Sequence, residues 1–81
     1  MAKILLIEDD EILSQLTLEQ LVKAGHDVTG AASWRTAYDY LKSQEPNLIL
    51  MDARLPDGDS LEKLPELVSD YPVIVLTAYG S

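Results

Sequence analysis

The stretch Ile4-Leu5-Leu6-Ile7-Glu8-Asp9-Asp10 decides the fold, because four apolar residues run directly into three acids. A continuous apolar run of this length is typical of a strand buried on both faces, as in a parallel sheet covered by helices. The pattern returns twice, since Leu48–Met51 ends at Asp52 and Val73–Leu76 ends at Thr77. The sequence therefore predicts a buried parallel sheet with polar residues at the ends of its strands.

The segments between these runs carry helical patterns. Asp10 is a candidate N-cap for the first helix, and Gly25 stands where a helix C-cap favours a left-handed residue. Ser33 can cap the next helix. Alternating strands and helices predict an α/β fold with right-handed crossovers. The predicted elements are strand Ile4–Ile7, helix Glu11–Ala24 with the stripe Leu13, Leu16, Thr17, Leu21 and Ala24, strand His26–Ala31, a helix packed through Trp34, Ala37, Tyr38 and Leu41, strand Leu48–Met51, loop Leu55–Asp59, a helix over about Ser60–Val68 and strand Val73–Leu76.

Composition limits the class of protein. A chain of 81 residues is one domain or part of one. Fourteen acidic and six basic residues give a net charge of -8, which repels the phosphates of nucleic acids and anionic membranes. There is no cysteine for a disulfide or a thiolate metal site, and the N-terminus runs into a strand without a signal-peptide core. We expect a cytoplasmic protein that binds neither nucleic acid nor membrane through this segment.

Carboxylates gather at the ends of the predicted strands, where open α/β sheets bind their ligands. The first strand delivers Glu8, Asp9 and Asp10, and the strand before Asp52 delivers a fourth acid. Like charges this close either hold a proton or bind a cation, and oxygen ligands without Cys or His favour a hard ion such as Mg²⁺. If a phosphoryl group binds beside these acids, the hydroxyl of Thr77 can donate to one of its oxygens. Asp10 is explained equally well as a helix N-cap.

Three motifs resemble the response regulator receiver domains of two-component systems. They are Lys3–Asp10 (KILLIEDD), Leu48–Gly58 (LILMDARLPDG) and Val73–Ser81 (VIVLTAYGS). The motifs stand in the family's order and spacing, and the last resembles receivers that precede AAA+ activators of the alternative sigma factor. The resemblance implies a flavodoxin-like parallel sheet, with residues 1–81 as a partial receiver domain of four strands and three helices.

The resemblance also implies a role for each site residue. Asp52 is expected to accept a phosphoryl group from a sensor histidine kinase or phosphotransferase, with Mg²⁺ as cofactor. Thr77 is expected to contact the phosphoryl group and act as the switch toward an output domain outside this chain. Such a module is a signalling domain and not an enzyme. The expected Mg²⁺ ligands are Asp9, Asp52, Glu8 through water, the backbone carbonyl of Arg54 and, in an assisting role, Asp10.

The chain departs from the family pattern after its fourth strand. The lysine that ends the family's fifth strand has no counterpart, since none of Lys3, Lys23, Lys42 and Lys63 stands at the end of a predicted strand. Strand Val73–Ala78 is then expected to form an apolar edge that favours self-association as a dimer. A second function therefore stays open, that of a truncated or pseudo-receiver acting by protein association alone.

Two other classes fit the sequence less well. A phosphatase of the haloacid dehalogenase type also places an Asp nucleophile after an apolar strand, but it needs a second Asp where Arg54 stands. A nucleotide-binding fold needs a Gly-x-Gly-x-x-Gly motif or a P-loop after the first strand, and neither occurs there.

Overall fold

The computed structural model describes residues 2–52, 54–55, 58–59 and 65–76, and for residues 54, 55, 58 and 59 it describes the backbone alone. Residues 65–68 are helical, in agreement with the end of the predicted third helix, whose first part lies outside the described residues. The alternation of strands and helices is confirmed. The elements are β1 (Lys3–Ile7), α1 (Glu11–Lys23), β2 (Asp27–Ala31), α2 (Trp34–Leu41), β3 (Leu48–Asp52), β4 (Arg54–Leu55), β5 (Gly58–Asp59) and β6 (Val73–Leu76).

The four longer strands form one parallel sheet in the order β2-β1-β3-β6. Ile4 of β1 pairs with Val28 on one side and Leu48 on the other, and Leu50 of β3 pairs with Ile74. β1 and β3 therefore lie at the centre of the sheet, which explains why their sequences are apolar without interruption. This order is the flavodoxin-like one that the family resemblance implied.

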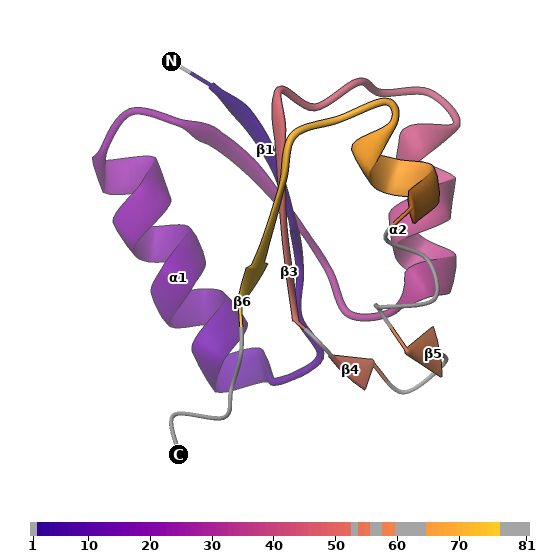
Figure 1. Ribbon diagram of the computed structural model, residues 1–81. Helices are drawn as coiled ribbons and strands as arrows, with labels where there is room; N and C mark the ends of the chain where they lie inside the picture. Colours follow the sequence, from indigo (N-terminus) through magenta and orange to yellow (C-terminus); the bar gives the residue numbers. More distant parts are fainter. Residues whose placement is uncertain (1, 53, 56–57, 60–64, 77–81) are drawn as a thin grey trace.

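Helices cover the sheet on both faces, with α1 on one side and α2 with residues 65–68 on the other (Figure 1). Successive residues of β1 point to opposite faces, so Leu5 packs with Trp34 of α2 while Leu6 packs on the side of α1. Trp34 is only 2% exposed. Each fully buried Leu or Ile stabilises the fold by about 1.5–3 kcal/mol relative to an exposed one. The core therefore has two layers, one on each face of the sheet.

The predicted helix ends are confirmed at three positions. Asp10 caps α1, and Gly25 follows it with a φ of 94°, in the left-handed region that favours glycine. Ser33 caps α2 by accepting the N–H of Thr36 at 3.2 Å. α1 ends at Lys23, with Ala24 as its C-cap, one residue earlier than predicted.

The predicted apolar stripe of α1 is only partly correct. Leu21 packs on the sheet, but Leu13 and Leu16 are 43% and 52% exposed. Leu18, which was not predicted, packs on the sheet in their place. The reason is that α1 packs mainly against β2. The Leu18 side chain lies close to Gly30 of that strand, since a Cβ atom placed on Gly30 would be 3.9 Å from Leu18 Cδ1. The buried side of the helix is therefore rotated away from the predicted stripe.

The loop predicted over Leu55–Asp59 contains regular backbone structure. β4 and β5 pair antiparallel, with Arg54 opposite Asp59 and Leu55 opposite Gly58. A ladder of two residue pairs is too short to leave an alternating pattern in a sequence. The hairpin lies directly after β3, beside the carboxyl ends of the central strands (Figure 1).

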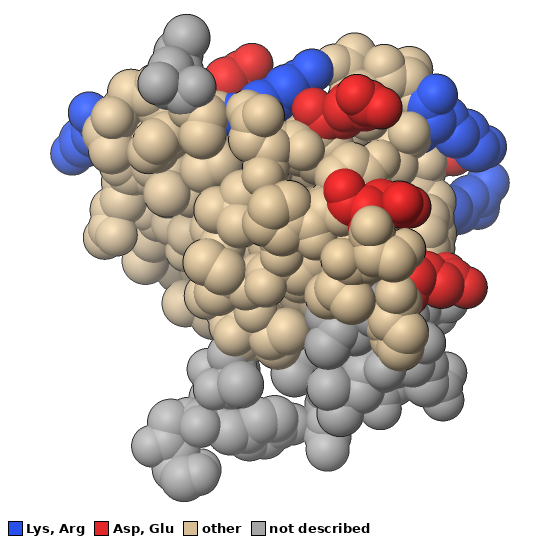
Figure 2. Space-filling view, turned by 45° about the horizontal axis from the view of Figure 1, so that its top comes forward, with Lys and Arg blue, Asp and Glu red and all other residues tan. Residues whose placement is uncertain are grey.

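Acidic and basic side chains are both present on the face of the molecule shown in Figure 2, and near its upper edge they lie next to each other. An ion pair joins Lys42 Nζ to Asp39 Oδ1 at 3.3 Å on the surface of α2. Exposed pairs of this kind contribute little to stability. Among the described helices, none is long and apolar enough to cross a membrane.

Candidate functional site

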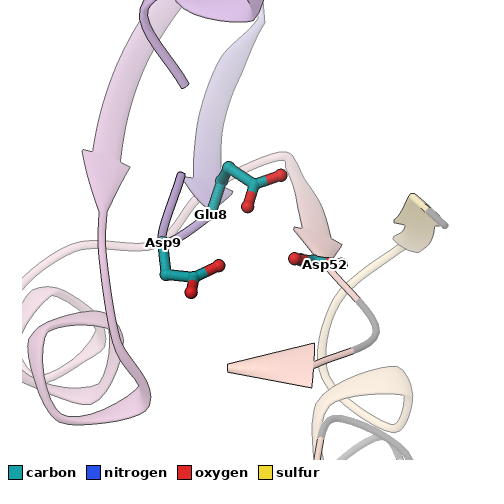
Figure 3. Close-up of side chains that lie close together, drawn as sticks. All are labelled: Glu8, Asp9 and Asp52. Carbon is teal, nitrogen blue, oxygen red and sulfur yellow. The ribbon is translucent and has the colours of Figure 1, made fainter. Parts of the chain in front are cut away.

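Three acids meet at the carboxyl ends of the central strands. Glu8, Asp9 and Asp52 each offer a carboxylate oxygen, and these oxygens lie within 4.8 Å of one another. Figure 3 shows the three side chains converging from β1 and β3. They meet because β1 and β3 are parallel neighbours, so the residues that follow their last apolar positions emerge at the same edge of the sheet.

Two of these acids are buried and one is exposed. Glu8 and Asp52 are each 8% exposed, whereas Asp9 reaches solvent. The backbone of Glu8 extends the sheet, because its N–H donates to the carbonyl oxygen of Ala31 at 2.9 Å. Its side chain is oriented by the N–H of Asp10, which donates to Glu8 Oε2 at 3.2 Å. Hydrogen bonds thus hold both the backbone and the side chain of Glu8, and its carboxyl group is buried.

The enclosed charge changes the titration of Glu8. Burial raises the pKa of Glu8 from 4.5 to about 7. Burial is the largest cause of this rise in pKa; the negative charge of Asp52 and hydrogen bonds with Asp52 and Asp9 contribute to it, while the N–H of Asp10 acts in the opposite direction. Near neutral pH the metal-free site therefore holds a proton for part of the time.

The donor set fits a hard cation. Glu8, Asp9 and Asp52 supply oxygen atoms alone, which Mg²⁺ prefers over nitrogen and sulfur ligands. A bound cation would offset the repulsion that raises the pKa of Glu8. Arg54 opens β4 two residues after Asp52, so its backbone carbonyl remains a candidate ligand.

The remaining predicted site residues have separate outcomes. The Asp10 carboxylate is not among the three that converge, and its Oδ1 accepts the N–H groups of Ile12 at 2.9 Å and Leu13 at 3.1 Å. Asp10 therefore acts as the N-cap of α1 in this structure. Thr77 lies outside the described residues.

A cavity beside the site was not predicted from the sequence. It has a volume of about 650 Å³ and extends from Glu8 and Asp9 along the groove between α1 and the end of β2. Ile12 and Leu16 line one wall, and small residues from Gly30 onward line the other. Three consecutive small residues at the end of a strand, Gly30, Ala31 and Ala32, were the signal in the sequence that could have revealed it.

The strand order and the site together define the class of protein. The chain passes from β1 outward to β2 and then crosses to β3 on the other side, so the connections reverse direction between β1 and β3. Open α/β sheets bind ligands outside the carboxyl ends of their strands at such a reversal. This is a flavodoxin-like α/β domain with an oxygen-only site at its topological switch point.

The chain belongs to the response regulator receiver domain family, whose family model matches residues 4–81. It is similar to the transcriptional regulatory protein CrdR of Helicobacter pylori, with 38% identity over 80 residues. The MaeR response regulator bound to beryllium trifluoride superposes with a TM-score of 0.87 at 29% identity. The non-phosphorylated HemR receiver domain from Leptospira biflexa also superposes with a TM-score of 0.87, at 30% identity. The resemblance seen in the sequence is confirmed.

The coverage of these relatives is unequal. The similarity to CrdR includes 94% of this chain and 38% of that protein. The MaeR and HemR structures are matched over 100% of this chain and over 70% and 68% of their own chains. The shared part is therefore the receiver domain, the module of response regulators in two-component signalling.

Proposed function

We propose that this chain is a phosphoryl-accepting module in which Asp52 is the acceptor and Mg²⁺ is the cofactor. The observation that carries the proposal is the buried carboxylate of Asp52 at the end of β3, with Glu8 and Asp9 converging on it. Without a cation, the negative charges of Asp52 and the two acids beside it would repel an incoming phosphoryl group. A divalent cation beside Asp52 would offset this repulsion.

Each acid has its own proposed role in binding Mg²⁺. Asp9 and Asp52 would hold the ion directly, Glu8 would hold it through water, and the backbone carbonyl of Arg54 would complete the protein ligands. Asp10 was expected to assist, and its capping bonds to α1 favour an indirect contribution. When bound, the cation would supply positive charge that offsets the negative charge of an incoming phosphoryl group.

The transfer itself is a nucleophilic substitution at phosphorus. A carboxylate oxygen of Asp52 attacks the phosphorus of a phosphohistidine on a sensor histidine kinase or phosphotransferase. The P–N bond breaks, its electron pair stays on the imidazole nitrogen, and an acyl phosphate forms. The hydroxyl of Thr77 donates to a phosphoryl oxygen and serves as the switch. The group ends on the protein itself, so the chain acts as a signalling module and not as an enzyme.

The readout lies outside this segment. Phosphorylation adds about -1.5 to -2 charges at neutral pH, which biases the surface near β6 toward an output domain. The net charge of -8 opposes direct contact with nucleic acid or anionic membranes. A cytoplasmic receiver that controls a transcription regulator fits these features, and the similarity to CrdR supports it.

Self-association is a second candidate function with its own supporting observation. β6 is the last strand in the order β2-β1-β3-β6 of the described residues, and Ile74 in its centre is 50% exposed. An apolar edge strand is a template for pairing with another chain. We expect a dimer through this edge, and light scattering that shows a stable monomer would reject it.

The test of the proposed function is uptake of one phosphoryl group. The chain is treated with acetyl phosphate and Mg²⁺, and its intact mass is measured. We expect a mass increase of one phosphoryl group that is absent with EDTA and absent in Asp52→Ala. Asp70→Ala is the matched control, because Asp70 is exposed and lies at the opposite end of the strands. Uptake that persists in Asp52→Ala rejects the assignment.

A further inference from the structure

Asp10 stands between the acids of the site and the first turn of α1. Its Oδ1 accepts the N–H of Ile12 at 2.9 Å and the N–H of Leu13 at 3.1 Å. Its carbonyl oxygen accepts the N–H of Ser14 at 2.9 Å. Its backbone is extended, with φ of -78° and ψ of 112°. The helix therefore fixes both the side chain and the backbone of Asp10.

The same residue also contacts the site. Its N–H donates to Glu8 Oε2 at 3.2 Å, so the position of that oxygen depends on the backbone of Asp10. At the other end of the segment, the N–H of Glu8 donates to the carbonyl oxygen of Ala31 at 2.9 Å. Asp9 lies between two residues that are held in place. A continuous series of hydrogen bonds thus joins β2, the acid segment and α1.

We propose that Asp10 is a positioning residue for the metal site, acting through its helix-capping bonds and not as a ligand. The inference rests on the proposed function, because it takes Glu8, Asp9 and Asp52 to hold a hard cation. Without the capping bonds, the segment Glu8–Asp10 populates other conformations. The apparent affinity for the cation then falls in proportion to the fraction of the segment that remains competent.

Four substitutions of Asp10 by uncharged residues distinguish the effect of the helix cap from the effect of the negative charge. Asp10→Asn and Asp10→Ser keep a side-chain oxygen that caps a helix well, whereas Asp10→Ala and Asp10→Gly have none. All four remove the same negative charge, so the weaker attraction of the cation is common to them. Glycine is tolerated at N-cap positions much better than alanine, so Asp10→Gly keeps the comparison possible if Asp10→Ala does not fold.

The measurement is the binding of Mn²⁺ alone, as a probe of the hard-cation site. Free Mn²⁺ is followed by electron paramagnetic resonance at constant pH and ionic strength, Mg²⁺ is added as a competitor, and circular dichroism records folding and melting. We expect Asp10→Asn and Asp10→Ser to bind Mn²⁺ equally well. Asp10→Ala is expected to bind about fivefold more weakly than these two, which is the effect of losing one helix cap, and Asp10→Gly, which costs the cap less, by less than about twofold.

Equal affinity of Asp10→Ser and Asp10→Ala overturns the proposal, since the capping oxygen then contributes nothing to the site. If the two differ only in melting temperature, the cap serves stability alone. Retention of binding in Asp10→Asn with loss in Asp10→Ser also overturns it, because that pattern is expected of a ligand. Asp9→Asn and Asp52→Asn test the site separately. Unchanged Mn²⁺ binding in both would reject the proposed metal site itself, whatever the Asp10 variants show.

Discussion

Replacing Glu8 by glutamine removes a titrating group from the buried part of the acid site while keeping the shape of the side chain. Glu8 is 8% exposed, and burial together with the charge of Asp52 raises its pKa from 4.5 to about 7. Between these values the folded chain keeps Glu8 protonated while the unfolded chain has already ionised it. The metal-free protein therefore loses stability as the pH rises from about 4.5 to about 7, and Glu8→Gln removes that loss.

The size of the effect follows from the two pKa values. Each pH unit between them corresponds to about 1.4 kcal/mol, so the rise from 4.5 to about 7 gives a ceiling of about 3.5 kcal/mol. Total stabilities of small domains are about 5–15 kcal/mol, which makes this a large share. The glutamine oxygen can still accept the N–H of Asp10, and its amide can donate to Asp52. We expect Glu8→Gln to stabilise the metal-free chain by up to about 3.5 kcal/mol above pH 7.

The assay is urea unfolding in EDTA at a series of pH values. Trp34 reports unfolding by its fluorescence, because it is the single tryptophan and is 2% exposed in the core. Glu45→Gln is the matched control, since Glu45 is exposed in the loop before β3. The same chemical change there should alter the free energy of unfolding by less than about 0.5 kcal/mol at every pH.

The decisive quantity is the difference in unfolding free energy between Glu8→Gln and the unaltered chain. The reasoning requires this difference to be small at the acid end and to grow as the pH approaches about 7. A difference that stays constant with pH would show that Glu8 titrates normally. A difference of the opposite sign above pH 7 would show that the ionised carboxylate stabilises the metal-free fold, and it would refute the argument.

Three further predictions concern the backbone, the core and the metal. Gly25→Ala should destabilise by about 1–2 kcal/mol in denaturant unfolding, because its φ of 94° strains a side-chain residue; Gly30→Ala, whose Cβ would meet Ser14 Oγ at an ordinary 3.6 Å, should change stability little. Leu5→Ala should lower the free energy of unfolding by about 2–5 kcal/mol, because it leaves a cavity under α2; the measurement is the decrease in the urea concentration at the midpoint of unfolding. Mg²⁺ at about ten times its Kd should add about 1.4 kcal/mol of stability in a thermal melt, and Asp9→Asn should remove most of that gain.

The parts of the fold that depend on local pattern could be predicted from the sequence. The apolar runs that end at Glu8 and Asp52 located the two central strands and the acid site between them. The caps Asp10 and Ser33 were also predictable, because a capping side chain bonds to N–H groups only two or three residues away. Each of these signals is complete within a few consecutive residues.

The features that were missed depend on how the elements pack. Which side of α1 is buried is set by its placement over β2, so Leu18 packs on the sheet while Leu13 and Leu16 are exposed. No periodicity within the helix carries that information. The cavity beside Glu8 likewise needs the small side chains from Gly30 onward to lie opposite α1. The raised pKa of Glu8 requires its burial to be known, and sequence alone gives only its neighbours.

Stability and cation binding draw on the same geometry at this site. β1 and β3 carry Glu8 and Asp52 to the edge of the core because their apolar residues are buried on both faces, and this burial is what raises the pKa of Glu8. Moving these acids to the surface would relieve the repulsion, but their oxygens would no longer converge within 4.8 Å with that of Asp9. A bound divalent cation would offset the repulsion while the acids stay buried. If the proposed cation binds here, part of the free energy by which the buried acids weaken the metal-free chain would be recovered on binding, and the cation would favour the proposed acceptance of further negative charge at Asp52.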